Sequence, residues 1–354
     1  MSHDMNSPRL SVVSRPPRSC PMVEFHFQGT PRIRGVNEIE FNGSRNTTCW
    51  VREGDRPTLH VGLGPMAEEM ADRFRQSCGV AAKALLRLGQ SEFCLNLQGF
   101  ETHAQAAAEG VLLAAYRFED FKEPSARRKN PLRGLHAWVG ARAMEAAKNA
   151  FARGGVLAEA TNYARAVGNL PPNVIYPETL AEKALELAKE VGVECRVWDE
   201  RALRREGFGG ILAVGGGSIR APRLIELKSR AAARKAPVVV VVGKAVTFDT
   251  GGVSIKPAER MEEMKWDKMG GCAVLGIVRA VKRLKLPIHL VGLIPSAENM
   301  PGASAYRPSD LVRTWDGKVI EVLNTDAEGR VILADALAYG RQTHKPDLMI
   351  DLAT

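Results

Sequence analysis

The stretch that decides the fold is Val238-Val239-Val240-Val241-Val242-Gly243, in which five β-branched residues run up to a glycine. A short apolar run of this kind is typical of a strand buried on both faces. Charged segments follow it: Lys244-Ala245-Val246-Thr247-Phe248-Asp249-Thr250-Gly251-Gly252, then Met264-Lys265-Trp266-Asp267 and Asn324-Thr325-Asp326-Ala327-Glu328-Gly329-Arg330. Because ligands of α/β sheets bind beyond the carboxyl ends of the strands, these segments predict a functional site.

Length and composition predict a folded protein of two domains. The chain has 354 residues, of which 45% are hydrophobic and 25% are charged, the balance of ordinary globular domains. The sequence contains no run of about 18 or more apolar residues, so we expect no membrane span. Residues 1–21 lack the apolar segment of a secretory signal, and we expect them to form a disordered head. The six cysteines are scattered without a CxxC pair, which indicates free thiols in a reducing cytoplasm.

Apolar periodicity predicts strands that alternate with helices, and therefore α/β domains with largely parallel pairing. In the first half we expect strands over 22–27, 59–63 and 93–97, and helices over 66–88, 105–116 and 141–167. In the second half we expect helices over 177–191, 200–206, 271–284 and 331–340, and strands over 194–198, 211–214, 223–227, 238–242, 289–294 and 348–352.

The pair Pro171-Pro172 ends the helix before it and marks the predicted domain junction. We therefore expect an amino-terminal α/β domain with a linker helix over 22–168, and a second α/β domain over 169–354. The chain stops at Thr354, at the tip of a predicted strand, so we expect the second domain to be truncated at its carboxyl end.

Four carboxylates of the charged segments, Asp249, Asp267, Asp326 and Glu328, predict a metal site. Left unpaired at strand ends they would repel one another and resist desolvation, so a cation must gather them. The side chains of Asp326 and Glu328 point the same way if their loop is extended. Four carboxylates are more than one ion needs, and two ions with bridging carboxylates account for them better.

The donor set also bears on which ion binds. None of the seven histidines falls within these segments, and carboxylates alone favour Mn²⁺ or Mg²⁺, although Zn²⁺ and Co²⁺ accept them too. The alternative is a set of ordinary loop carboxylates that pair with Lys256, Lys265 and Arg330.

The net charge of +9 raises a second hypothesis, a DNA-binding or structural protein with little or no catalysis. Nine basic residues and two acidic ones lie over 201–235. Such an excess can attract nucleic acid. More often it is a solvated face, so nucleic acid is a less favoured partner than a small substrate.

These motifs resemble those of the leucyl aminopeptidases, the M17 cytosol aminopeptidases. The matching residues are Lys244-x4-Asp249-Thr-Gly-Gly-x3-Lys256, Lys265-Trp266-Asp267 and the heptapeptide Asn324-Thr-Asp-Ala-Glu-Gly-Arg330, which is that family's signature. Supporting matches include Glu298-Asn299-Met300-Pro301 and Ala305-Tyr306-Arg307-Pro308. The resemblance runs from about residue 105 to the end and implies a variable amino-terminal domain followed by a mixed-sheet α/β catalytic domain.

The resemblance also implies a role for each site residue. One ion would be held by Asp249, Asp326 and Glu328, and the other by Lys244, Asp249, Asp267 and Glu328. Lys256 would polarise the scissile carbonyl, Arg330 would hold a bicarbonate that acts as general base, and Met264 and Asn324 would line the substrate pocket. The implied protein is a cytoplasmic metallo-exopeptidase that uses Mn²⁺ or Zn²⁺, acts on peptides with free amino termini, and assembles as a homo-hexamer.

Overall fold

The computed structural model describes residues 7–52, 56–66, 70–128 and 130–354. The chain divides into two compact units, Met1–Asn162 and Tyr163–Thr354. The division falls inside α3 (Met144–Asn169), whereas the sequence suggests a junction between residues 168 and 169. Each unit has its own sheet and is described separately.

The first unit is built on a six-stranded sheet with the order β1-β6-β5-β2-β4-β3. Its strands are β1 (Arg9–Val13), β2 (Met22–Phe27), β3 (Thr48–Val51), β4 (Thr58–Gly64), β5 (Glu92–Asn96) and β6 (Gly134–Trp138). All neighbours pair in parallel except β3 and β4, which confirms the prediction of largely parallel pairing.

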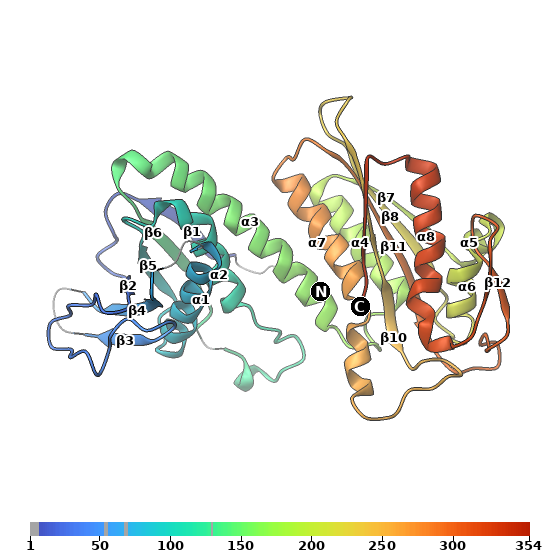
Figure 1. Ribbon diagram of the computed structural model, residues 1–354, viewed down its shortest axis with the longest axis horizontal. Coiled ribbons are helices and arrows are strands. Elements are labelled where there is room, and N and C mark those ends of the chain that lie inside the picture. Colours follow the sequence, from blue (N-terminus) through green and yellow to red (C-terminus); the bar gives the residue numbers. More distant parts are fainter. Residues whose placement is uncertain (1–6, 53–55, 67–69, 129) are drawn as a thin grey trace. The chain divides into compact units, whose positions relative to one another are not determined.

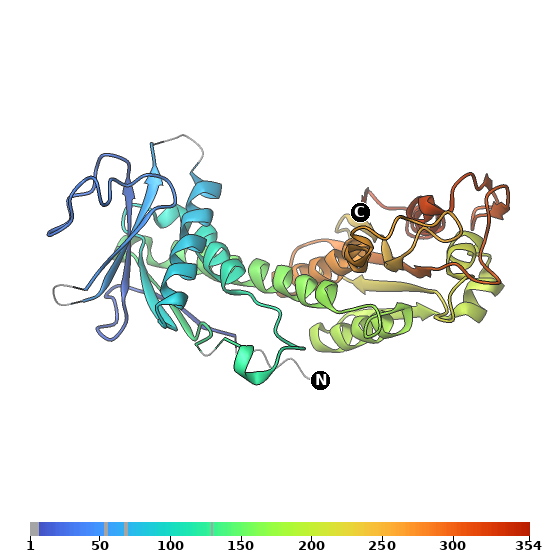
Figure 2. The ribbon, with the colours of Figure 1, turned by 90° about the horizontal axis from the view of Figure 1, so that it is seen from below.

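Helices α1 (Ala71–Arg87) and α2 (Ala104–Ala115) cover one face of this sheet, as Figure 2 shows, with short 3-10 turns at Glu101–His103, Pro124–Ala126 and Ala141–Ala143. Alternate strand residues such as Val23 and Phe25 point into the core beneath these helices, to which the start of α3 adds Phe151. The opposite sheet face therefore carries the intervening residues, among them Glu24 and His26.

The expectation of a disordered head is wrong for Arg9–Val13, which form β1 and pair in parallel with β6. Leu10 and Val12 pack against the core, and this burial offsets the cost of ordering so short a segment. Residues 1–6, and residues 67–69 of the helix predicted over 66–88, lie outside the described residues.

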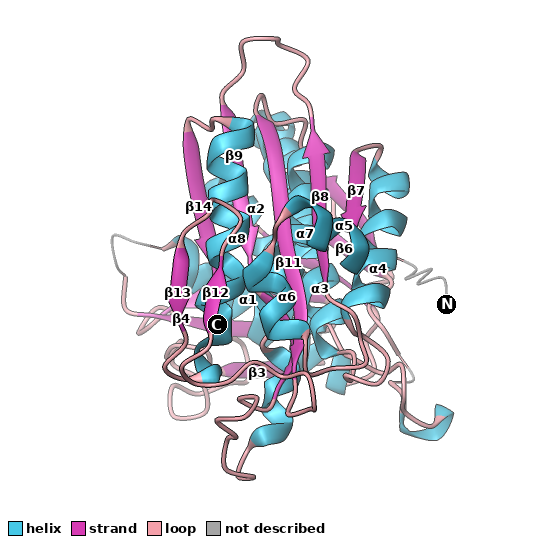
Figure 3. Ribbon diagram, turned by 90° about the vertical axis from the view of Figure 1, so that its right-hand side faces the viewer, coloured by secondary structure: helices cyan, strands magenta, loops and turns pink. Residues whose placement is uncertain are grey.

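The second unit contains a mixed sheet with the order β14-β9-β11-β8-β7, seen face on in Figure 3, and β10 also pairs with β11. Its strands are β7 (Glu194–Trp198), β8 (Arg223–Ser229), β9 (Val238–Gly243), β10 (Ala245–Asp249), β11 (His289–Asn299) and β14 (Leu348–Leu352). Strands β14, β9, β11 and β10 pair in parallel, whereas β8 is antiparallel to β11 and to β7. A small separate ladder joins β12 (Leu311–Arg313) and β13 (Val319–Glu321).

Helices cover both faces of the second sheet, as Figure 1 shows. Two of them, α4 (Pro177–Val191) and α7 (Met269–Arg283), enclose one apolar core, and α5 (Glu200–Glu206), α6 (Gly209–Gly215) and α8 (Glu328–His344) enclose the other. Between these cores, Val240 and Val242 of β9 face one and Val241 faces the other. The run of valines is therefore buried on both sides, as its sequence predicts.

The strand predicted over 211–214 is wrong, because these residues belong to helix α6. Ile211 and Val214, one helical turn apart, are buried, and the Ile211 N–H donates to Asp335 Oδ2 at 2.9 Å. A four-residue apolar run has no period of its own, and this long-range hydrogen bond fixes it as helix. The predictions for α4, α5, β7 and β14 agree with the observed bounds.

Two further predictions concern membrane spans and the state of the cysteines. None of the helices among the described residues combines the length and the hydropathy needed to cross a lipid bilayer. All six cysteines are free thiols.

Candidate metal centre

The predicted carboxylates lie where elements of the second unit begin or end. Asp249 is the last residue of β10, and Asp267 follows the 3-10 helix Met261–Trp266. Asp326 lies in the 3-10 turn Thr325–Ala327, and Glu328 begins α8. Lys244 follows the last residue of β9 directly. Segments far apart in sequence thus bring these side chains to one place.

Two lysine ammonium groups tie the four carboxylates together. Lys244 Nζ lies 2.7 Å from Asp267 Oδ1 and 2.9 Å from Glu328 Oε1. Lys256 Nζ lies 2.9 Å from Asp249 Oδ2 and also pairs with Asp326 Oδ1. The ammonium groups therefore stand where cations would gather the carboxylates.

The lysines leave the centre short of positive charge. Burial raises the pKa of Glu328 to about 7, and the neighbouring Asp249 adds to this effect. Burial likewise raises the pKa of Asp267. Asp267 Oδ2 and Glu328 Oε2 are buried and accept no hydrogen bond from the residues that the structure describes. Buried carboxylate oxygens without partners are costly, and a further cation would satisfy them.

The two lysines are held as cations by their partners. Burial opposes the charge of Lys244, but Glu328 and Asp267 outweigh it, and the pKa of Lys244 is raised. Burial also opposes the charge of Lys256, and here Asp326 and Asp249 raise the pKa well above its ordinary value.

The turn after Asp249 needs its two glycines. Gly251 and Gly252 have φ of +85° and +68°, a region that L side chains rarely adopt. A Cβ atom at Gly251 would lie 2.5 Å from the Ser254 carbonyl oxygen, and one at Gly252 would lie 2.7 Å from Asn299 Oδ1. The turn thus brings the backbone close to the carboxylates without any side chain between them.

Buried polar residues, to which the sequence assigns no role, support the carboxylates. Asn299 Nδ2 donates to Asp249 Oδ1 at 2.8 Å and to the Thr325 carbonyl at 3.1 Å. The Tyr306 hydroxyl donates to the same carbonyl at 2.8 Å, and Thr325 Oγ1 donates to the Gly251 carbonyl at 2.6 Å. The loops that carry Asp249 and Asp326 are therefore locked together. Asn299 and Tyr306 belong to the supporting motif matches, and this was the one indication in the sequence that they contribute to the site.

Lys268 is a further residue to which the sequence assigns no role. It is fully buried, and its Nζ donates to the carbonyl oxygens of Leu170, at 3.2 Å, and Lys265. Burial lowers its pKa to about 8. These bonds hold in place the segment that carries Asp267, the residue that precedes Lys268 in the chain.

The three remaining predicted site residues lie at the edge of the centre. Asn324 caps the turn that carries Asp326, whose N–H donates to Asn324 Oδ1 at 2.8 Å. Met264 lies half-buried in the 3-10 helix before Asp267, and Arg330 is exposed on the first turn of α8. Within the described part of the chain, no hydrogen bond or ion pair joins Met264 or Arg330 to the carboxylates.

The donor set fits divalent ions. One oxygen from each of Asp249, Asp326 and Glu328 lies within 4.8 Å of the others, and the unpaired oxygens of Glu328 and Asp267 offer further ligands. All are hard oxygen donors, which suit Mn²⁺ and Mg²⁺ and are accepted by Zn²⁺. The fold and this centre define the class as α/β proteins with a cluster of carboxylates suited to divalent ions.

Comparison with known proteins specifies the family. The model of the cytosol aminopeptidase family catalytic domain matches residues 162–354, and the model of that family's N-terminal domain matches residues 32–125. This chain is 46% identical over 307 residues to a probable cytosol aminopeptidase of Roseiflexus castenholzii, covering 84% of this chain and 62% of that protein. It is 43% identical over 297 residues to another of Cenarchaeum symbiosum, covering 83% and 60%.

Among solved structures, the bottromycin maturation enzyme BotP in complex with Mn is similar, with a TM-score of 0.85 and 32% identity. The match covers 95% of this chain and 72% of that one. The chain belongs to the cytosol aminopeptidase family, which confirms the resemblance and the fold class read from the motifs. It spans 60–62% of the length of the two curated relatives.

Proposed function

We propose that this chain carries the catalytic site of a metal-dependent aminopeptidase, which removes amino-terminal residues such as leucine from peptides with the help of two divalent ions. The observation that carries the proposal is the convergence of four carboxylates, from separate segments, on two lysines. Membership of the cytosol aminopeptidase family supports the reaction class.

The carboxylates divide into two overlapping sets of ligands. Asp249, Asp326 and Glu328 would hold one ion, and Asp249, Glu328, Asp267 and Lys244 the other. When bound, the ions would supply Lewis acidity and lower the pKa of a shared water. We propose Mn²⁺ or Zn²⁺, and the similarity to BotP, whose structure contains Mn, supports the first.

Lys244 has to change its protonation state to serve as a ligand. Only a neutral amine has a free lone pair, whereas Glu328 and Asp267 favour the ammonium form. Lys244 would therefore have to lose a proton from Nζ before it could serve as a ligand.

Lys256 is the residue that we propose acts on the substrate directly. Asp326 and Asp249 keep it cationic, and its side chain is about one-fifth exposed, so it can reach a bound peptide. An ammonium group so placed would polarise the scissile carbonyl and stabilise the oxyanion that forms. We further propose that Arg330 holds a bicarbonate that takes the proton of the attacking water.

The rest of the proposal concerns the substrate and the assembly. Met264 and Asn324, which flank Asp267 and Asp326, would line the pocket for the amino-terminal side chain. We propose peptides with free amino termini as substrates, a homo-hexamer as the assembly, and the cytosol as the location, the last supported by the relatives' names.

The DNA-binding hypothesis is less well supported. Basic residues of the stretch 201–235 pair locally with acidic ones: Arg204 with Glu200 at 2.8 Å, and Lys228 with Glu226 at 2.6 Å. Such pairing reduces the field available to a phosphate backbone.

Hydrolysis of leucine p-nitroanilide tests the proposal. The purified chain is stripped with a chelator, reloaded with Mn²⁺ or Zn²⁺, and assayed beside Asp326→Asn, Glu328→Gln and the control Glu321→Gln, which alters an exposed carboxylate on β13. We expect metal-dependent activity that the first two variants abolish and the control retains, with unchanged circular dichroism throughout. Near-normal kcat in Asp326→Asn or Glu328→Gln would refute the ligand assignment.

A further inference from the structure

A second group of metal-ligating side chains lies in the first unit. Glu24 and His26 are two residues apart on β2, and His60 lies on β4, where it is the direct partner of Glu24 in the parallel ladder. Their neighbours Val23, Phe25, Leu59 and Val61 point into the core beneath α1 and α2. Since side chains alternate along a strand, all three groups share the opposite face of the sheet.

The three ligand atoms are close enough to surround a single ion. His26 Nε2 lies 2.9 Å from His60 Nδ1, and His60 Nδ1 lies 3.7 Å from Glu24 Oε2. One atom from each residue lies within 4.8 Å of the other two. Zinc–ligand bonds of about 2.0–2.1 Å in a tetrahedron place neighbouring ligand atoms roughly 3.4 Å apart. Shifts of a few tenths of an ångström would therefore bring the imidazole pair to that spacing.

We propose that Glu24, His26 and His60 form a binding site for one divalent transition-metal ion of the zinc type, separate from the carboxylate centre of the second unit. The ligands are His26 Nε2, His60 Nδ1 and a carboxylate oxygen of Glu24. Two imidazoles and one carboxylate are a donor set that zinc accepts, and they leave a fourth position for water or another ligand.

The charge state of the imidazoles suits a metal. Burial, helped by the neighbouring His26, lowers the pKa of His60 to about 4, and burial also lowers the pKa of His26. Burial thus favours the neutral form of both imidazoles, and one ring donates the hydrogen bond that joins them. A bound ion would replace this one hydrogen bond with two coordinate bonds and would give the partly exposed Glu24 carboxylate a counter-charge.

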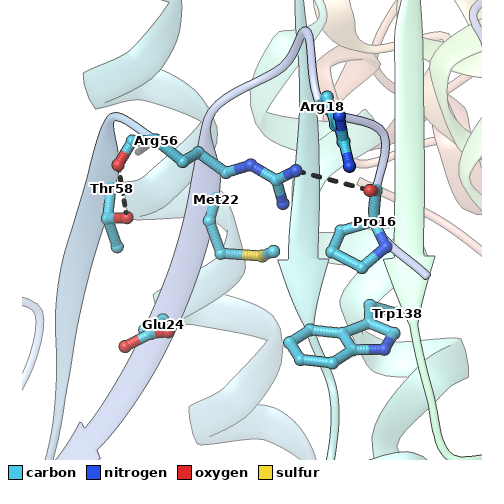
Figure 4. Close-up of a pocket in the computed structure, with 7 residues that line it drawn as sticks. All are labelled: Pro16, Arg18, Met22, Glu24, Arg56, Thr58 and Trp138. Carbon is cyan, nitrogen blue, oxygen red and sulfur yellow. Dashed lines mark hydrogen bonds between the residues drawn. The ribbon is translucent and has the colours of Figure 1, made fainter. Parts of the chain in front are cut away.

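An aromatic ring packs against the two histidines, and a cavity beside Glu24 opens the proposed site to solvent. The ring of Phe41 lies edge-on to His26, with the ring centroids 5.8 Å apart. Glu24 also lines an open cavity of about 710 Å³ together with Met22, Thr58 and Trp138. Figure 4 shows Glu24 at one end of this cavity and the cationic Arg18 and Arg56 at the other, so the end nearest the ligands is the acidic one.

The site would tie β2 to its neighbour β4 in the first sheet. An ion that binds the folded chain and not the unfolded one stabilises the fold in proportion to the logarithm of its concentration over its Kd. Zinc is therefore expected to raise the midpoint of unfolding of the first unit.

The same sheet face offers a matched control. His136 of β6 accepts or donates at both ring nitrogens, 2.6 Å from Ser11 Oγ and 2.8 Å from Glu92 Oε1. Its nitrogens are already used by protein groups, and it belongs to no cluster of ligands found among the described residues. His136→Gln thus removes an imidazole that is buried like that of His60, without touching the proposed site.

The test titrates Co²⁺ and Zn²⁺ into the full chain carrying Asp326→Asn and Glu328→Gln, which disable the carboxylate centre. We expect one ion per chain and the intense visible absorption of tetrahedral Co²⁺. In this background His26→Gln or His60→Gln should weaken binding by roughly 100-fold or more, whereas His136→Gln should leave it unchanged.

Circular dichroism checks that each variant is folded, and the half-exposed Glu24→Gln provides a ligand variant with little risk to the core. Zinc-edge anomalous diffraction should show a peak between the three side chains. An unchanged Co²⁺ spectrum in His26→Gln and His60→Gln, or no Co²⁺ bound by the parent, would overturn the proposal and leave the pair as a hydrogen bond between two histidines.

Discussion

At the residue scale, Lys256 is the group whose contact should strengthen during the reaction. We predict that Lys256→Ala lowers kcat by about 10²–10³-fold and changes KM much less, because an oxyanion develops charge that the ground-state carbonyl lacks. Steady-state kinetics on leucine p-nitroanilide measure both constants. Lys265→Ala is the control, since its Nζ lies over the Trp266 ring, 4.7 Å from the centroid. A rise in KM at constant kcat in Lys256→Ala would assign Lys256 to substrate binding alone.

Only some of the site residues could be predicted from the sequence. Asp249, Asp267 and Glu328 stand out because charge beside an apolar strand is unusual. The structure brings Asp249 close to Glu328, and Lys244 joins Glu328 to Asp267. Lys268 does not stand out in the sequence, and Asn299 does so only as part of a motif match. The carbonyls and carboxylates that these two residues contact come beside them only in the folded chain.

At the element scale, Asp335 of α8 joins α6 to the loop after β12. Its carboxylate accepts from the N–H groups of Ile211 at 2.9 Å and Trp315 at 2.7 Å. Burial raises its pKa to about 6, above its value in the unfolded chain. The associated stability is thus fully present below about pH 4 and is lost as the pH rises through about 6.

We therefore predict that the free energy of unfolding of the parent falls relative to that of Asp335→Asn by about 2 kcal/mol between pH 4 and pH 7. Denaturant unfolding at each pH measures the difference. A gap between the two proteins that is independent of pH would show that Asp335 has an ordinary pKa.

A second prediction at this scale concerns the close packing of α1 against α2. A Cβ atom at Gly110 would lie 2.1 Å from the Arg75 carbonyl oxygen, so Gly110→Ala must push the helices apart. We expect a loss of about 1–3 kcal/mol in the free energy of unfolding, although alanine favours helix. Gly140→Ala is the control, because its nearest contact would be at 3.9 Å. Equal stability of the two variants would refute this account of the packing.

Helices and strands could be predicted where their own apolar residues recur with the period of a helix or a strand. Helix α4 and strand β7 follow such patterns and agree with their predicted bounds. Strand β1 was missed because five residues show little by themselves and its partner lies far along the chain, with Ser11 and His136 separated by 125 residues. Helix α6 was misassigned because a distant carboxylate decides its conformation.

At the scale of the whole molecule, the proposed assembly is a hexamer. We predict that sedimentation equilibrium of the purified chain gives six copies, and that duplex DNA neither co-sediments with it nor is retained at physiological salt. The net charge of +9 should give only weak association that salt abolishes. A monomer that binds DNA at such salt would favour the DNA-binding hypothesis instead.

The central claim is that carboxylates from three segments gather two divalent ions in the second unit. Anomalous diffraction at the manganese edge, from crystals grown with Mn²⁺, tests it most directly. We predict two peaks, one among Asp249, Asp326 and Glu328 and the other beside Lys244 and Asp267. Density for the two lysines still paired with these carboxylates, with no manganese peak between them, would contradict the claim.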